Sequence, residues 1–385
     1  MAGIYIHIPF CASRCIYCDF YSTTLRGKAH EYVDAVLKEY QQRSDFLPKG
    51  EPLRTVYIGG GTPSQLPAEE LARLIDGIIS FSSNISIEEI TIEANPEDIT
   101  EDWAETIMDR ITLSSSNIHT LTPSHLRISM GVQSLIDSEL RLLNRRHDSQ
   151  KPSEAVRILQ SKGFSNISLD LMYGLPNQTM ESWEKSIDGI VSLDPQHISA
   201  YCLSIEEGTR LEKMINDGVL ATCDDDTCLK MAHLLRGKLK KAGYVQYEIS
   251  NYAKPGFESK HNSSYWDGTP YLGLGPGAHS YDGASRRCWN EHDVTAYIDG
   301  ERKEGYELLT ETDRYNEMIM LSLRTAKGID CERLMNNTPE NKLLNKQNII
   351  KQLRKRNLVT IKQNHLILTE AGLALADEVI RDLMI

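Results

Sequence analysis

The sequence lacks the features that mark membrane, secreted and low-complexity proteins. Its 385 residues contain no run of about eighteen apolar residues, the length that a helix needs to cross a bilayer. The first residues do not combine a basic segment, an apolar segment and a cleavage site, so we expect no secretory signal. We therefore predict an ordinary soluble globular protein, in keeping with 40% hydrophobic and 25% charged residues.

Acidic residues outnumber basic ones, and cysteine usage is ordinary. Lys and Arg number 42 against 54 Asp and Glu, which gives a formal net charge of −12. Such a chain repels phosphate groups, which argues against nucleic acid or an anionic membrane as its main partner. Eight cysteines occur, and because an oxidising compartment would threaten closely spaced thiolates, we predict a cytoplasmic protein.

Three of the cysteines lie close together. Cys11, Cys15 and Cys18 form a CxxxCxxC pattern directly after the apolar segment 5–10 (YIHIPF). A structural zinc site takes four ligands, and no fourth Cys or His lies at a suitable spacing. Soft thiolates also suit iron–sulfur clusters, so we favour a [4Fe-4S] cluster with one open iron over zinc or a free thiol loop. We interpret the other cysteines as structural: Cys202, Cys223, Cys228, Cys288 and Cys331.

The first two hundred residues alternate between short apolar segments and segments of helical periodicity. This alternation is typical of βαβ units, whose strands form a parallel sheet. Six such units make most of a barrel, and the length fits a barrel of roughly 200–250 residues with a smaller domain. We therefore predict an α/β fold, a partial (β/α)6 barrel of the TIM type. The expected strands are residues 3–8, 54–58, 89–93, 126–130, 166–172 and 196–202.

Glycine and polar residues follow these strands. In such barrels the segments after the carboxyl ends of the strands form the ligand-binding face. The run 59–61 (GGG) would let the backbone approach a small zwitterion. Glu93, Gln133 and Asp170 offer hydrogen bonds to an ammonium group or a nucleoside, and Arg145 can pair with a carboxylate. Each feature alone is explained as well by loop geometry or a surface ion pair, but together they predict a ligand site.

The chain divides into three predicted parts. We expect a barrel core at residues 1–205, an extension at 206–310, and a smaller α+β domain at 311–385 that resembles a winged helix. Winged helices often bind DNA, and residues 351–356 are basic, but the acidic chain favours protein contact or core support. The stretch 110–125 reads as a polar surface insertion. Further expected elements are a strand at 244–249, helices at 314–323, 342–355 and 371–384, and a hairpin of 358–361 with 365–368.

Several longer motifs occur along the chain: YIHIPFCASRCIYCDF, YIGGGTPSQL, IEANPE, RISMGVQS, LDLMYGLPNQT and LGLGPGAHSY. Together they resemble one family, the HemN/HemW branch of the radical S-adenosylmethionine (SAM) proteins. The resemblance covers almost the whole chain and implies that Cys11, Cys15 and Cys18 ligate a [4Fe-4S] cluster whose fourth iron binds SAM. It also implies contacts with one or two SAM molecules from Tyr5, Tyr17, Gly60, Gly61, Thr62, Glu93, Gln133, Arg145 and Asp170.

A later motif implies a heme site. Residues 261–266 read HNSSYW and match the HNxxYW motif of the HemW branch, where the motif is linked to heme. On spacing alone, a His beside aromatic residues is more often packed core. Imidazole is nevertheless a common axial ligand of heme iron, and Tyr and Trp rings can cover a porphyrin face. The resemblance thus implies heme contacts from His261, Asn262, Tyr265 and Trp266.

Two functions fit the sequence. The oxidase of this branch has a further cysteine two residues after its third cluster ligand, where this chain has Phe20. With the HNxxYW motif, this departure favours a heme chaperone that binds the cluster, SAM and heme, and delivers heme to recipient hemoproteins. Its electron donor would be a flavodoxin or a ferredoxin. The alternative is an oxygen-independent coproporphyrinogen III oxidase, in which SAM-derived radicals decarboxylate porphyrinogen propionates; we expect no such activity.

Overall fold

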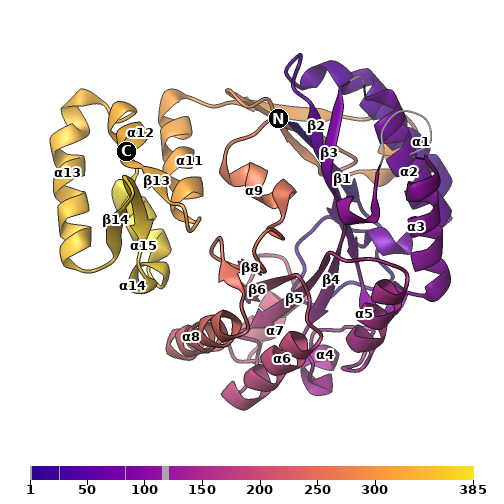
Figure 1. The fold of residues 1–385 in the computed structure, drawn as a ribbon, viewed down its shortest axis with the longest axis horizontal. Coiled ribbons are helices and arrows are strands. Elements are labelled where there is room, and N and C mark those ends of the chain that lie inside the picture. Colours follow the sequence, from indigo (N-terminus) through magenta and orange to yellow (C-terminus); the bar gives the residue numbers. More distant parts are fainter. Residues whose placement is uncertain (1, 26, 83, 115–120) are drawn as a thin grey trace.

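The structure, a computed structural model, describes residues 2–25, 27–82, 84–114 and 121–385. Within these ranges the largest element is a sheet of 12 strands, in the order β12-β11-β10-β9-β1-β2-β3-β4-β5-β6-β8-β7. Strands β1 to β6 follow the order of the chain, and each neighbouring pair is parallel. The sheet curves strongly and carries helices along its outer side (Figure 1). The predicted α/β class with a large parallel sheet is confirmed.

The six parallel strands lie close to the positions predicted from the apolar segments. A parallel sheet that is covered on both faces needs nearly continuous apolar strands, and Ile4, Ile6 and Ile8 of the first strand are fully buried. The strands are β1 (Ala2–Ile8), β2 (Leu53–Gly60), β3 (Ile85–Ala94), β4 (Leu126–Gln133), β5 (Ile167–Tyr173) and β6 (His197–Cys202).

The connecting helices pack an apolar stripe against the outer face of the sheet. In α2 (Ala68–Phe81), Leu71, Leu74, Ile75 and Ile78 recur at helical spacing and are fully buried. Because each helix returns the chain to the start of the next parallel strand, the carboxyl ends of all six strands meet at one edge. The other helices of this part are α1 (Ala29–Arg43), α3 (Glu101–Ser114), α4 (Asp137–Leu142), α5 (Lys151–Ser161) and α6 (Met180–Ser192).

Strands from residues 206–310 extend the sheet at both edges. The sequence predicted one strand at 244–249, but the structure has two short ones, because the chain turns where Tyr247 N–H donates to Asn251 O (3.2 Å). The first of them, β7 (Val245–Gln246), pairs with β8 (Asn251–Ala253), which lies antiparallel to β6. At the other edge, β9 pairs in parallel with β1, and three antiparallel strands follow. These strands, which the sequence analysis missed, are β9 (Tyr271–Leu274), β10 (His279–Tyr281), β11 (Arg286–Asn290) and β12 (Glu304–Leu308).

One helix of this middle part differs from the others in its position. The helix α9 (Lys260–Trp266) lies on the inner side of the sheet, between the strands and the C-terminal helices (Figure 1). The remaining helices lie at the periphery; they are α7 (Arg210–Asn216), α8 (Asp225–Lys241) and α10 (Val294–Ile298).

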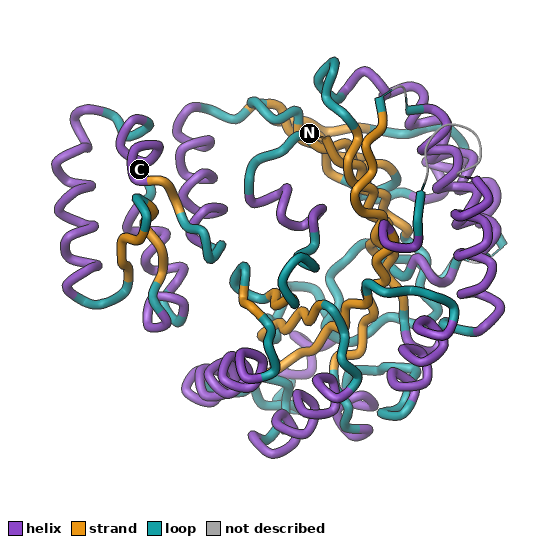
Figure 2. Tube along the Cα trace, viewed as in Figure 1, coloured by secondary structure: helices purple, strands orange, loops and turns teal. Residues whose placement is uncertain are grey.

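The C-terminal residues form a unit with its own hydrophobic core and a second sheet, in the order β13-β15-β14 (Figure 2). The predicted hairpin is confirmed, whereas the helix expected at 371–384 is divided into two, because the chain leaves helical geometry at Leu375. The elements are α11 (Glu311–Leu323), β13 (Ile329–Asp330), α12 (Cys331–Asn336), α13 (Glu340–Lys355), β14 (Val359–Lys362), β15 (His365–Leu368), α14 (Glu370–Leu373) and α15 (Ala376–Leu383).

Two predictions about the organisation of the chain remain untested. The surface insertion expected at 110–125 includes residues 115–120, which lie outside the described ranges, so its nature stays a prediction. The boundaries expected near 205 and 310 also stay predictions; strands from both sides of position 205 share one sheet. Among the helices that the structure describes, none has the length and apolar composition needed to span a bilayer.

Candidate functional site

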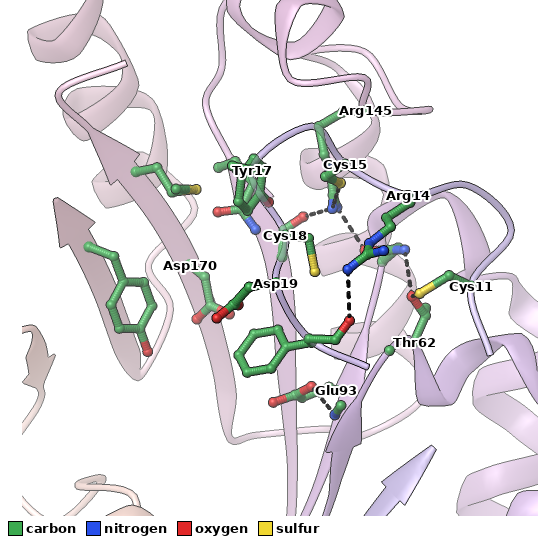
Figure 3. A pocket seen from close by; sticks show the side chains of 18 of the residues that line it. Cys11, Arg14, Cys15, Tyr17, Cys18, Asp19, Thr62, Glu93, Arg145 and Asp170 are labelled. Atoms are coloured by element: carbon green, nitrogen blue, oxygen red, sulfur yellow. Dashed lines mark hydrogen bonds between the residues drawn. The ribbon is translucent and has the colours of Figure 1, made fainter. Parts of the chain in front are cut away.

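A cavity of about 580 Å³ opens at the carboxyl ends of the parallel strands. All three cysteines of the N-terminal loop line it, together with residues at the ends of β2 to β6. Figure 3 shows Cys11, Cys18, Glu93 and Asp170 around this space. The sheet therefore brings together residues that are far apart in the sequence. The predicted SAM residues that line the cavity are Tyr17, Gly60, Gly61, Thr62, Glu93, Gln133, Arg145 and Asp170.

The cysteine loop is fixed to its surroundings by short contacts. Cys11 N–H donates to Thr23 O (2.9 Å), which closes the loop, and Cys11 Sγ lies 3.5 Å from Thr62 Oγ1. On the other side of the loop, Asn144 Nδ2 donates to Arg14 O (2.8 Å). The loop thus has a defined position over the sheet.

Arg145 connects the cysteine loop to the sheet. Its guanidinium donates to Asn95 Oδ1 (2.7 Å) and Gly131 O (2.5 Å), and its Nη1 lies 3.5 Å from Cys15 Sγ. The contact with Asn95, whose amide oxygen orients the guanidinium, was not predicted from the sequence. The predicted contact between Arg145 and SAM remains a prediction.

The glycine run after β2 is required by the packing of the protein itself. Gly60 has a φ of +110°, which L side chains rarely adopt, and a Cβ there would lie 2.6 Å from the His7 ring. A Cβ on Gly61 would lie 2.8 Å from Ile8 O. Both glycines border the cavity, and Gly60 N–H donates to Glu93 Oε2 (3.0 Å). Replacing Gly60 with valine would therefore disturb the sheet itself. A loss of ligand binding in such a variant would not show that Gly60 contacts the ligand.

Two carboxyl groups face the cavity from β3 and β5. Glu93 Oε1 accepts a hydrogen bond from Tyr57 OH (2.6 Å), and burial, reinforced by the nearby Asp170 carboxyl group, raises the pKa of Glu93 to about 7. Burial also raises the pKa of Asp170. Among the described residues, Asp170 Oδ1 has no hydrogen-bond partner. Because an unpaired buried oxygen is unfavourable, Asp170 marks a place where a ligand donor fits.

Gln133 and Tyr5 differ in their relation to the cavity. Gln133 ends β4 with a φ of +70° and lines the wall; such a conformation is strained for a residue other than glycine. Tyr5 lies on β1 outside the wall, with its hydroxyl 3.1 Å from His7 Nδ1 and its ring centroid 6.1 Å from that of Tyr57. A contact between Tyr5 and SAM therefore stays a prediction.

The HNxxYW residues form α9. Ser259 caps this helix by accepting from Asn262 N–H (3.3 Å). The buried carboxylate of Glu89, on β3, accepts from the backbone N–H groups of Lys260 (2.9 Å) and His261 (3.1 Å). The free N–H groups at the start of a helix favour a carboxylate there. Glu89 thereby holds α9 against the inner side of the sheet.

His261 is fully buried, and hydrogen bonds occupy both of its ring nitrogens. Nδ1 lies 2.8 Å from Thr55 Oγ1, and Nε2 lies 2.9 Å from Tyr265 OH. Burial lowers the pKa of His261 to about 3, so the ring is neutral. The ring also packs against Tyr57, at a centroid distance of 5.1 Å. Iron ligation by His261 stays a prediction, and it requires that one of these two bonds opens; for ligation through Nε2 this is the bond to Tyr265.

The other end of α9 faces a second cavity, of about 970 Å³. Tyr265 and Trp266 line this cavity, whereas neither His261 nor Asn262 belongs to its wall. The motif therefore faces two environments, with its histidine toward the inside of the curved sheet and its last two aromatic residues toward the second cavity.

Three cysteines that we interpreted as structural meet beside the first cavity. Cys228 lies close enough to Cys202 and to Cys223 for its thiol to affect the pKa of both, and Cys202 belongs to the wall of the first cavity. No spacing pattern could reveal this group, because its members come from the end of β6 and from the start of α8. Tyr201, next to Cys202, also lines the cavity and was not predicted.

Comparison with known proteins gives two family matches and close sequence relatives. Residues 5–190 match the Radical SAM superfamily, and residues 309–375 match the HemN C-terminal domain. The heme chaperone HemW of Bacillus subtilis strain 168 is 34% identical over 390 residues, which cover 98% of this chain and 98% of the relative. HemW of Escherichia coli strain K12 is 32% identical over 332 residues, covering 85% of this chain and 83% of the relative.

A solved structure agrees with the fold. Coproporphyrinogen III oxidase (HemN) from Escherichia coli, described as a radical SAM enzyme, is 23% identical, with a TM-score of 0.79 over 100% of this chain and 90% of that chain. This likeness supports the fold alone. The sequence relatives carry more weight, because the identity exceeds 30% over nearly the whole length of both chains. The predicted membership is therefore confirmed: the chain belongs to the HemW family of heme chaperones, within the radical SAM superfamily.

Proposed function

We propose that this protein is a heme chaperone that binds a [4Fe-4S] cluster, SAM and heme and delivers the heme to recipient hemoproteins. The observation that carries the proposal is the convergence of the three cysteines and most predicted SAM residues on one cavity, in a chain whose relatives are named heme chaperones. A flavodoxin or a ferredoxin would supply electrons. A cytoplasmic location would keep the thiolates reduced.

The fold suits this function. We interpret β1 to β6 with their helices as a partial (β/α)6 barrel of the TIM type, residues 206–310 as its extension, and residues 311–385 as a winged-helix-like domain. An incomplete barrel leaves its inner side open on one flank. In this protein α9 and the C-terminal helices lie along that flank (Figure 1).

The cysteine loop fits a cluster with one open iron. Cys11, Cys15 and Cys18 all line the cavity. Three soft thiolates in one loop suit an iron–sulfur cluster with one open iron better than a structural zinc ion, which takes four ligands. Burial raises the pKa of Cys18 to about 11 and raises that of Cys11, so cluster binding must displace thiol protons. A bound, reduced cluster would supply an electron to SAM.

The walls of the cavity fit the polar groups of SAM. Glu93 and Asp170 would accept hydrogen bonds from its ammonium group and ribose hydroxyls, since Asp170 Oδ1 is unpaired among the described residues. The backbone of Gly61 and the hydroxyl of Thr62 border the same space. Gln133, held in a strained conformation at the end of β4, would contact the nucleoside.

The raised pKa of Glu93 makes SAM binding pH-dependent. Because this pKa is about 7, the carboxyl group is mostly protonated at about pH 6 and gains charge as the pH rises. An ammonium group favours the ionised form, so we expect SAM affinity to rise roughly fivefold between about pH 6 and pH 7. The same raised pKa lowers the stability of the ligand-free protein as the pH rises toward 7, because over this range the unfolded chain has already lost the Glu93 proton while the folded state still holds it.

The control for this prediction is Glu93→Gln, which removes the titrating group but keeps the size of the side chain. Equilibrium dialysis with SAM should give weaker binding in this variant and no dependence on pH over the same range. If the wild-type affinity is flat while the variant binds equally well, Glu93 does not contact SAM.

The proposed function is tested by one pair of measurements on anaerobically reconstituted protein. We expect a heme titration to give a stoichiometric Soret band and an assay with coproporphyrinogen III to give no protoporphyrinogen IX. Phe20, which lines the first cavity and is 61% exposed, stands where the oxidase has a cysteine. Steady turnover of coproporphyrinogen III, or the absence of heme binding, would contradict the chaperone function.

A further inference from the structure

The second cavity lies between the core of the molecule and the C-terminal unit. Residues from α9, from the strands β9 to β11, and from α11 and α12 line it. Its volume of about 970 Å³ lies at the upper end of the range of small-molecule sites, roughly 300–1,000 Å³. The cavity therefore has room for a large ligand rather than a metabolite of a few atoms.

One wall of this cavity is aromatic. Tyr265, Trp266, Tyr271 and Tyr281 all contribute to it. The rings of Tyr265 and Tyr271 meet edge to face, with centroids 4.8 Å apart and an interplanar angle of 84°. The ring centroids of Tyr271 and Tyr281 are 6.5 Å apart. Trp266 Nε1 is buried without a hydrogen-bond partner among the described residues. Such a row of rings suits a flat, largely apolar ligand.

Three arginines border the same cavity, and they are not equivalent. Arg287 is already engaged, because it pairs with Glu317 (2.9 Å) and Glu307 (3.2 Å). Within the described residues, the guanidinium groups of Arg314 on α11 and Arg333 on α12 make neither an ion pair nor a hydrogen bond. Two unpaired guanidinium groups beside an aromatic wall are donors for a ligand that carries carboxylates.

Acidic side chains are also present in the wall and offset the positive charge of the arginines. Asp267, Glu311 and Glu317 contribute carboxylates, and Arg287 neutralises Glu317. The wall is thus close to neutral, whereas the whole chain has a net charge of −12. An anionic ligand meets less repulsion here than on an average part of the surface.

We propose that this cavity seats the porphyrin ring of heme and that Arg314 and Arg333 bind its two propionate groups. The inference rests on the proposed function and deepens it, because it assigns heme contacts to residues outside the HNxxYW motif. Tyr265 and Trp266 supply ring surface from α9, and the C-terminal unit supplies the cations. The C-terminal unit is then part of the heme site rather than a separate module.

The test is a set of ligand titrations with the full-length, reconstituted protein. Hemin is titrated by absorbance into the wild type, Arg314→Gln, Arg333→Gln and the double variant. Arg157→Gln is the matched control, because Arg157 is an exposed arginine on α5, away from the cavity. We expect the dissociation constant to rise about tenfold for each lost arginine, in line with a charge-assisted hydrogen bond, and to stay unchanged in the control.

Two further ligands distinguish binding of the propionates by the arginines from ligation of the heme iron. Hemin dimethyl ester, which lacks charged propionates, should bind the wild type as weakly as hemin binds the double variant. Metal-free protoporphyrin IX should show the same arginine dependence as hemin, because the arginines act on carboxylates and not on iron. Equal affinity of the wild type for hemin and its ester, or variants that match Arg157→Gln, would overturn the inference while leaving the chaperone function intact. Failure of the wild type to bind hemin would instead overturn the proposed function, and this inference with it.

Discussion

Alanine in place of any one of Cys11, Cys15 or Cys18 is expected to abolish the [4Fe-4S] cluster. Each variant leaves two thiolates in the loop, and the side chains that contact the loop cysteines are not thiols: Arg145 Nη1 faces Cys15 and the Thr62 hydroxyl faces Cys11. Neither group replaces a thiolate as a soft ligand. Iron and acid-labile sulfide analysis of anaerobically reconstituted protein should fall from about four of each per chain to near zero.

The matched control is Cys223→Ala, which removes a thiol that lies outside the wall of the first cavity. Its iron and sulfide content should equal that of the wild type. Full cluster content in all three loop variants would refute the central proposal. A partial loss in Cys223→Ala would assign a part in cluster assembly to the group of Cys202, Cys223 and Cys228.

Replacing His261 should weaken heme binding, whereas removing the hydroxyl of Tyr265 should not. If the His261 imidazole ligates iron, His261→Ala should shift the Soret band and weaken heme binding at least tenfold, about 1.4 kcal/mol. Tyr265→Phe keeps the ring but removes the hydroxyl that occupies His261 Nε2. This variant should bind heme as tightly as the wild type or more tightly, because the nitrogen no longer has to give up a hydrogen bond.

Absorbance titration and the position of the Soret band decide between the outcomes. A loss of binding in Tyr265→Phe as large as that in His261→Ala would show that the phenol, and not the imidazole, is the group that heme needs. Thermal unfolding should accompany the titrations, since His261→Ala also leaves Thr55 and Tyr265 without their partner, at a cost of roughly 1–3 kcal/mol for an unsatisfied buried group.

Much of the fold was predictable because parallel strands need continuous apolar segments and the helices between them need an apolar stripe. The positions of strands β1 to β6 follow from these patterns, although β3 is ten residues long where the pattern predicted only residues 89–93. Strands β9 to β12 do not, because all four are short, and β11 and β12 are also partly exposed and contain charged residues such as Arg286 and Glu307. Their strand geometry comes from pairing with β1 and with one another, which is a tertiary effect that no local pattern carries.

The candidate site was predictable to the extent that it follows from strand order. Glu93, Gln133 and Asp170 meet because parallel strands place their carboxyl ends at one edge. The orientation of His261 was not predictable, since it depends on Glu89 and Thr55 at distant positions in the chain. The same holds for Arg314 and Arg333, whose nearness to Trp266 comes from the packing of the C-terminal unit against α9.

Tyr57 contacts one residue proposed to bind SAM and one residue proposed to bind heme. Its hydroxyl donates to Glu93 in the first cavity, and its ring packs against His261 of the HNxxYW helix. A ligand that displaces either neighbour changes the environment of the other through this one side chain. Linkage then requires reciprocity: whatever factor bound SAM imposes on the affinity for heme, bound heme imposes on the affinity for SAM. In a chaperone with this coupling, the occupancy of the SAM site sets the affinity with which heme is held.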